Sequence, residues 1–133
     1  IIVVRASAPG ALEDAFATLV RQRADALMVG ADGSFLRRRV QLTTLAARHG
    51  LPAVFTTREY AEAGGLMSYG TSLPEAFRMT GFYTGRILKG AKPADLPVVQ
   101  STKFDFVINV PTARAIGLDV PPSLLSVADE VIE

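Results

Sequence analysis

The chain has 133 residues, 49% of them hydrophobic, and a formal net charge of +1, which is typical of one folded globular domain and excludes a disordered chain. The balanced charge gives no electrostatic basis for binding nucleic acid or an anionic membrane surface, and no apolar run approaches the roughly 20 residues of a membrane span. The absence of cysteine excludes disulfides and thiolate chemistry, and with a single histidine we predict neither a metal site nor a cofactor.

Strand and helix patterns alternate through the first half of the chain. Four apolar segments predict strands at residues 1–5, 26–31, 52–56 and 64–70. A first helix is predicted to start with Ser7 or Ala8 as its N-cap and Pro9 in its first turn. Its apolar face is Leu12, Phe16, Leu19 and Val20. Short loops between alternating elements predict right-handed βαβ units and a parallel sheet.

A second helix is predicted after Asp32, with its end at His49 and Gly50. Its apolar arc is Phe35, Leu36, Val40, Leu42, Ala46 and Ala47. A short helix or turn is predicted at residues 58–63. Residues 30–34 are superficially similar to a phosphate loop, but they lack the Gly-Lys-Ser/Thr ending, so a strand end followed by a helix cap is the favoured interpretation.

The glycine-bracketed strand at residues 64–70 is where we expect the chain to leave this lobe. A long helix then runs from Pro74 to about Lys89 and is apolar on two sides, so it needs two packing partners. A proline-marked connector follows at residues 91–97. The rest predicts strands at residues 98–100 and 104–109, a short helix at 111–116, and a break at Pro121 and Pro122 before an acidic end.

Several stretches together carry a resemblance to a known family. They are ADALMVGAD at residues 24–32, LAARHGLPA at 45–53, REYAEAGGLMSYG at 58–70, ILKGAKPADLP at 87–97, KFDFVIN at 103–109 and PPSLL at 121–125. In this collinear order they resemble the substrate-binding proteins of bacterial ABC importers, close to members that bind tryptophan and other aromatic amino acids.

The resemblance implies an α/β lobe with a three-layer parallel sheet, of the type I periplasmic-binding-protein-like fold. Residues 1–70 then form the βαβ core of the second lobe, and residues 71–133 form a crossing helix and a return segment. The first lobe, and the opening strand and helix of the second, are expected to be missing. The resemblance further implies permease subunits as partners and a periplasmic or membrane-anchored extracytoplasmic location.

Loops that follow parallel strands form the candidate ligand site, because ligands bind beyond the carboxyl ends of such strands. The candidate residues are Asp32, Ser34, Thr56, Arg58, Tyr69 and Thr71. An aromatic ring at Tyr69 suits stacking on an apolar ligand, hydroxyls at Ser34 and Thr56 suit hydrogen bonds, and the fork of Arg58 suits a carboxylate. A turn or capping role is the alternative interpretation of each residue.

The expected function is non-enzymatic binding of a small amino acid or aromatic carboxylate between two lobes. Two alternatives stay open: the sensor domain of a transcription regulator, and a doubly wound enzyme whose catalytic residues lie outside this chain. With one wall of the cleft, the chain by itself is expected to bind ligand weakly and to self-associate through its exposed apolar surface.

Overall fold

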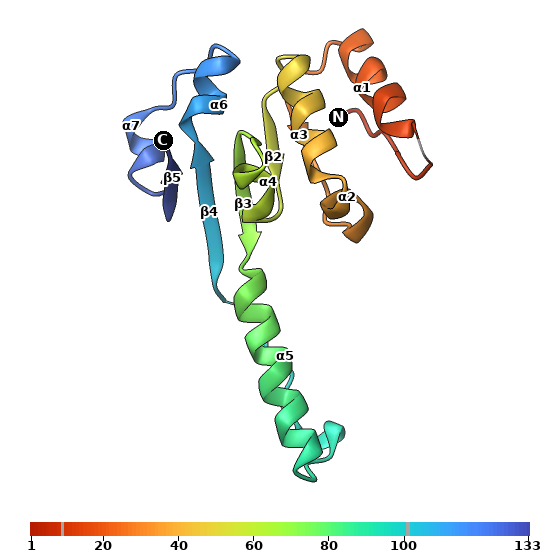
Figure 1. Cartoon of the computed structure of the whole chain (residues 1–133), viewed down its shortest axis with the longest axis vertical. Helices are drawn as coiled ribbons and strands as arrows, with labels where there is room; N and C mark the ends of the chain where they lie inside the picture. The colour runs from red at the N-terminus through yellow and green to blue at the C-terminus, as the bar shows by residue number, and fades with distance from the viewer. Residues whose placement is uncertain (9, 101) are drawn as a thin grey trace.

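The computed structural model describes residues 1–8, 10–100 and 102–133. One five-stranded sheet of order β1-β2-β3-β4-β5 forms the lobe, and a long helix projects from it (Figure 1). The strands are β1 (Leu27–Met28), β2 (Ala53–Phe55), β3 (Met67–Thr71), β4 (Phe104–Asn109) and β5 (Glu130–Ile132). The first three are parallel, β4 is antiparallel to β3, and β5 is parallel to β4. The α/β class with a mostly parallel sheet is therefore confirmed.

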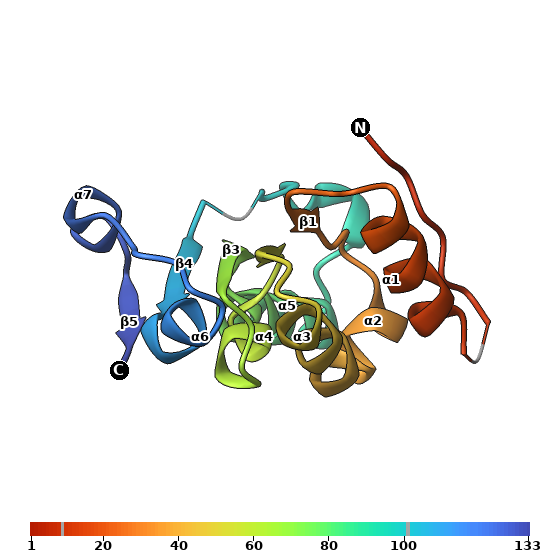
Figure 2. The same cartoon turned by 90° about the horizontal axis from the view of Figure 1, so that it is seen from above.

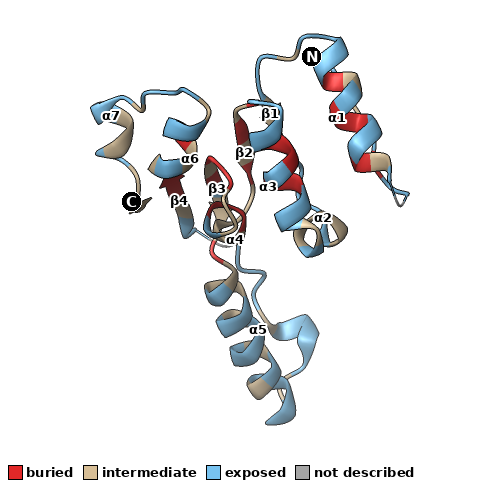
Figure 3. Ribbon diagram, turned by 45° about the horizontal axis from the view of Figure 1, so that its top comes forward, coloured by how far each residue is buried: buried red, intermediate tan, exposed pale blue. Residues whose placement is uncertain are grey.

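Short helices cover one face of this sheet. They are α1 (Ala11–Arg21), α2 (Gly33–Arg37), α3 (Arg39–Arg48), α4 (Arg58–Glu62) and α6 (Val110–Ala115). Viewed along the strands, α2, α3, α4 and α6 lie together on one side (Figure 2). Figure 3 shows that the buried residues gather where α1, α3 and α4 meet β2, β3 and β4. Phe16 and Leu42 of this core are almost fully buried, and each such side chain contributes about 1.5–3 kcal/mol.

The strand register divides the side chains between two faces of the sheet. Phe55, Ser68 and Val107 pair across β2, β3 and β4 and are all buried, so their row lies on the helix-covered face. Met28 and Met67 belong to the neighbouring row, on the opposite face. Met28 is 77% exposed, so this second face carries no helix where it passes β1.

The projecting helix is α5 (Leu73–Leu88), close to its predicted bounds. It has no buried residue, and Phe77 is 71% exposed. A connector containing η1 (Pro93–Asp95) returns beside it, held where the Tyr83 hydroxyl donates a hydrogen bond to the Pro97 carbonyl at 2.8 Å. The connector thus partly covers Met79 and Tyr83 on one apolar stripe of α5, while Phe77 on the other stripe stays exposed. A second partner outside the chain stays a prediction.

The start of the chain differs from expectation. Residues 1–5 form no strand: they are extended, but no described strand pairs with them, and the apolar pattern alone cannot supply the missing ladder. Helix α1 begins at Ala11, with Gly10 as its N-cap at φ 80°, so the Ser7 or Ala8 cap was wrong. A left-handed φ is the conformation that glycine adopts without strain, which explains the later start. Pro9 lies outside the described residues.

Three interior predictions also need correction. The strand predicted at residues 26–31 is shorter in the structure, where only Leu27–Met28 form a strand paired with β2. The single helix predicted after Asp32 is interrupted at Arg38, whose amide closes a turn on Phe35, so α2 and α3 are separate. In α3, Thr43 and Leu45 are buried together with Leu42 and Ala46. Side chains predicted on apolar arcs are instead exposed at Val20, Val40 and Ala47.

The carboxyl-terminal part holds one wrong strand and two unforeseen elements. Residues 98–100 form no strand, because Val98 and Val99 are exposed and face no partner strand among the described residues. Beyond Pro121, α7 (Pro122–Leu125) and then β5 continue the fold where a break was expected. A three-residue strand leaves too short a pattern to detect, and it forms because β4 offers a free edge.

Asn109 ties the end of β4 to α4 and α6. Its side-chain amide donates to the Ala61 carbonyl at 3.0 Å, and its carbonyl oxygen accepts from the Thr112 amide at 2.9 Å, capping α6. We expect Asn109→Ala to lower the free energy of unfolding by about 1–3 kcal/mol, because it leaves buried polar groups unpaired. Urea denaturation measures this loss. Asn109→Asp keeps the cap acceptor but places a buried carboxylate against the Ala61 carbonyl, so it should lose at least as much stability. An aspartate variant as stable as the original protein would contradict the assigned donor role.

Candidate functional site

The loops that leave β1, β2 and β3 lie at one edge of the sheet. Because these strands are parallel, their carboxyl ends point the same way, and α2, α4 and α5 all begin there. In Figure 1 this is the edge from which α5 descends. The N-caps of the three helices are Asp32, Thr57 and Ser72. The candidate residues proposed from the sequence all lie on these loops or next to them.

Asp32 and Ser34 form one turn. The Asp32 carboxylate accepts a hydrogen bond from the Ser34 amide at 2.7 Å and a second from the Ser34 hydroxyl. The hydroxyl, then the amide, hold the pKa of Asp32 below its usual value. The helix-cap interpretation of this turn is confirmed. The Ser34 hydroxyl therefore donates its hydrogen bond within the turn, although its oxygen can still accept one.

Thr56 and the second half of β3 are in close contact. A Cβ added at Gly70 would lie 1.8 Å from the carbonyl oxygen of Thr56 and 2.8 Å from its carbonyl carbon. Only glycine lets the two backbones approach this closely. The structure thus brings Thr56 next to Tyr69 and Thr71, the residues that flank Gly70.

Tyr69 presents an aromatic surface on the face of the sheet opposite the short helices. Its ring stacks on Phe104 with centroids 5.7 Å apart and meets the edge of Phe106 at 6.1 Å. Thr71 pairs with Phe104 across the β3–β4 ladder and so shares this face. The tyrosine is 59% exposed, which leaves much of its ring free to contact another molecule.

Arg58 is engaged on the opposite face. Its Nε donates to Glu62 Oε1 at 2.9 Å and its Nη2 to Glu130 Oε2 at 2.8 Å. The Glu62 hydrogen bond is the main cause that raises the pKa of the guanidinium. Glu130 is in register with Val107, in the helix-covered row. The structure therefore does not bring Arg58 and Tyr69 together.

Sequence patterns missed buried polar atoms at the start of α4 and on β3. Thr57 Oγ1, Glu59 Oε2 and Ser68 Oγ are buried and have no hydrogen-bond partner in the described part of the chain. Tyr60, 1% exposed, stacks on Phe55 at 4.6 Å. Burial first, and then the charge of Asp32, raise the pKa of Tyr60 to about 12, so its hydroxyl is neutral. Periodicity marks such residues only as part of a short helix, so no signal distinguished them.

No group of three or more histidine, aspartate or glutamate side chains is placed to hold a metal ion in residues 1–8, 10–100 and 102–133. Across the same ranges, no helix is both long and apolar enough to cross a membrane.

An open, mostly parallel α/β sheet with its helix-starting loops gathered at the carboxyl edge defines the class of the molecule: a single α/β lobe whose loops are placed where ligands bind in such sheets. The chain belongs to the ABC transporter substrate binding protein family, whose model matches residues 1–132. No curated protein matches it.

Solved structures share the fold of this chain. A conserved domain protein from Vibrio cholerae has a TM-score of 0.83 and 22% identity, and an ABC domain from Streptococcus pneumoniae in complex with L-Trp has 0.82 and 28%. The ligand-free, open structure of a substrate binding protein with adhesive properties from Clostridium difficile has 0.61 and 22%. Each match covers 92% of this chain and 41% of the other chain, so this chain spans less than half the length of these proteins.

Proposed function

We propose that this chain is a ligand-binding lobe of the solute-binding component of a bacterial ABC importer. It binds a small organic molecule, an amino acid or an aromatic carboxylate, and catalyses no reaction. The observation that carries the proposal is the fold match, at 28% identity, to a domain in complex with L-Trp. The family match over residues 1–132 supports the same role.

The ligand is proposed to lie against the carboxyl edge, between this lobe and a second one. Tyr69 supplies a half-exposed ring for an apolar or aromatic group, and Thr56 and Thr71 supply hydroxyls beside it. Asp32 and Ser34 supply acceptor oxygens from the neighbouring loop. For Arg58 to bind a ligand carboxylate, it must first release Glu130, because both would occupy the same guanidinium fork.

The proposed partners follow from the family. A solute-binding component passes its ligand to the permease subunits, so the protein is proposed to act outside the cytoplasm, either free in the periplasm or anchored to a membrane. Its partners are a small molecule and the permease.

The test is a thermal-shift screen of the full-length protein. We expect L-tryptophan or a related carboxylate to raise the melting temperature, because a ligand that binds only the folded state stabilises it. Tyr69→Ala should weaken binding roughly tenfold or more, from the loss of about 1.4 kcal/mol of aromatic contact. Tyr69→Phe, which keeps the ring, is the matched control and should retain affinity.

Two results would count against the proposal. If only sugars or metal ions shift the melting temperature, the ligand class is wrong. If the full-length protein turns over the molecule that it binds, the function is enzymatic.

A further inference from the structure

A negative and a positive side chain lie near each other where the chain passes from β1 into α2. Asp32 is the N-cap of α2, and Arg37 is the last residue of this short helix. A Cβ added at Gly33, the first residue of α2, would lie 3.9 Å from Nη1 of Arg37, so the guanidinium folds back along the helix toward Asp32. In Figure 1, α2 lies at the end of the lobe from which α5 descends, which is the carboxyl edge.

Both side chains have capacity to bind a ligand. The two hydrogen bonds from Ser34 end on Oδ1 of Asp32, so Oδ2 can accept from another donor. Within the described part of the chain, Arg37 takes part in no ion pair, whereas Arg58 is held by two glutamates. Asp32 and Arg37 are both exposed. The acid and the base are therefore neighbours that do not neutralise each other by direct contact.

The local electrostatics keep this acid and base charged at neutral pH. The hydroxyl and then the amide of Ser34 hold the pKa of Asp32 below its usual value, and the charge of Arg37 adds a smaller effect in the same direction. That effect means that the two charges are close enough to interact. The guanidinium of an arginine stays protonated throughout. The carboxyl edge thus presents one negative and one positive charge beside each other.

A ligand with two opposite charges matches these two side chains better than a ligand with one. A carboxylate alone is attracted by Arg37 but repelled by Asp32, and an amine alone meets the reverse. A zwitterion satisfies both, because its ammonium donates to the aspartate while its carboxylate accepts from the planar fork of the arginine. In a free α-amino acid both charged groups are carried by one carbon atom, so a single acid and base on one short helix are sufficient.

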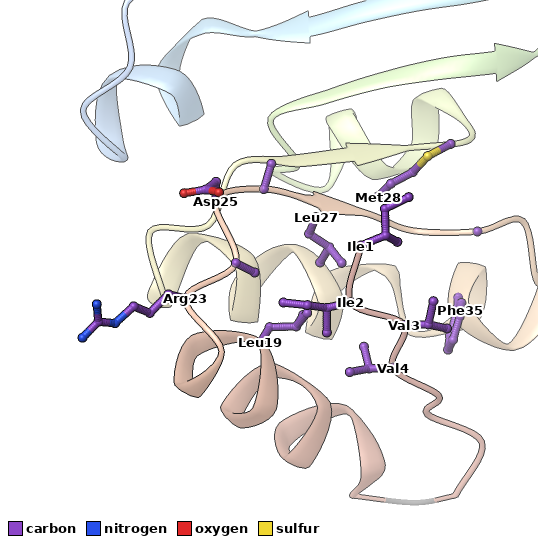
Figure 4. A pocket seen from close by; sticks show the side chains of 13 residues that line it. Ile1, Ile2, Val3, Val4, Leu19, Arg23, Asp25, Leu27, Met28 and Phe35 are labelled. Atoms are coloured by element: carbon purple, nitrogen blue, oxygen red, sulfur yellow. The ribbon is translucent and has the colours of Figure 1, made fainter.

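The large cavity beside β1 offers no such arrangement (Figure 4). It has a volume of about 710 Å³, and its lining reaches Phe35 of α2 but includes neither Asp32 nor Arg37. The lining side chains are apolar apart from Arg23 and Asp25, and Figure 4 shows Arg23 directed away from the cavity. Burying two charges against apolar side chains is costly. A zwitterion is therefore expected at the carboxyl edge and not in this cavity.

We propose that Asp32 and Arg37 recognise the two charges of a free α-amino acid. Oδ2 of Asp32 accepts a hydrogen bond from the ligand ammonium, and the guanidinium of Arg37 donates to the ligand carboxylate. The ligand side chain then extends past β2 toward Tyr69 on β3, two strand spacings or roughly 10 Å from β1. Arg58 keeps its bond to Glu130 in this arrangement. The inference rests on the proposed function and narrows its ligand from an amino acid or an aromatic carboxylate to an amino acid.

The first experiment determines which charges the ligand needs. Titration calorimetry of the full-length protein uses the amino acid that raises its melting temperature most, together with one relative that lacks the ammonium and one that lacks the carboxylate. For L-tryptophan these relatives are indole-3-propionate and tryptamine. We expect each relative to bind at least about 10-fold more weakly, because it loses a charge-assisted hydrogen bond and leaves one charge of the site unpaired.

The outcome separates this inference from the proposed function. If an aromatic carboxylate without an ammonium binds as tightly as the amino acid, the inference is overturned and the proposed function stands. The same holds if no amino acid binds while an aromatic carboxylate does. If neither class of ligand binds, both the inference and the proposed function are wrong.

Two substitutions assign each ligand charge to its residue. Arg37→Gln should weaken the binding of L-tryptophan about 10- to 100-fold without weakening that of tryptamine, which has no carboxylate to lose. Asp32→Asn, which keeps an acceptor for the cap of α2, should weaken L-tryptophan without weakening indole-3-propionate. Arg48→Gln makes the same change of charge at the far end of α3 and should retain all three affinities. Variants at Asp32 or Arg37 that weaken all three ligands equally would overturn the inference, because a purely structural effect does not distinguish the ligand charges.

Discussion

Replacing Gly70 by alanine is expected to destabilise the protein by about 3 kcal/mol or more. The added methyl carbon would lie 1.8 Å from the carbonyl oxygen of Thr56. The three atoms nearest to it all belong to the backbone of Thr56, so no side-chain rotation relieves the clash, and β3 must move away from the end of β2. The melting temperature should fall by roughly 10 °C. Scanning calorimetry of the two proteins measures this shift.

Gly85→Ala is the matched control. Gly85 lies inside α5, and a Cβ there meets no atom within 4 Å in the described structure. Alanine favours a helix over glycine by roughly 0.5–1 kcal/mol, so this variant should be neutral or slightly more stable. If Gly70→Ala behaved like Gly85→Ala, the close contact between β3 and Thr56 would not be a constraint on the fold.

Residues 1–133 expressed alone are expected to bind the ligand at least about 100-fold more weakly than the full-length protein. A ligand between two lobes is buried by both walls, and this chain provides one of them. Each 1.4 kcal/mol of lost contact costs about tenfold in affinity, so two or three lost hydrogen bonds or ring contacts are sufficient. Titration calorimetry with the molecule that stabilises the full-length protein measures the difference.

Sedimentation at several concentrations must accompany that titration. The helix-free face at Met28 and the exposed apolar side chains of α5 are expected to drive self-association of the chain alone. The affinity should therefore be compared at concentrations where the chain is monomeric. A monomer that bound the ligand as tightly as the full-length protein would contradict the two-lobe arrangement.

Local patterns predicted the elements whose signals lie within a few residues. Strands β2 and β4 and helix α5 carry clear apolar periods and are where they were expected. Residues 1–5 have an equally clear strand pattern but form no strand. A strand also needs a neighbouring strand to pair with, and a local sequence pattern does not show whether one is present. Gly10 moved the start of α1 for a conformational reason that composition does not reveal.

The candidate site was predictable in position and less so in detail. Parallel topology was enough to place Asp32, Thr56 and Tyr69 at or near one edge. The partner of Arg58 was not foreseeable, because Glu130 is 72 positions away and belongs to a strand that the sequence did not indicate. Whether the predicted residues bind ligand stays a prediction.

The mounting of α5 has a mechanical consequence. The helix begins just after β3, whose position is fixed by the close contact between Gly70 and Thr56. None of its 16 residues is buried. At 1.5 Å per residue the helix is about 24 Å long. A tilt of about 10° at Ser72 would displace its far end by about 4 Å. Such a tilt would start at the edge where the ligand is proposed to bind, so a small change there would become a larger displacement at the far end of α5.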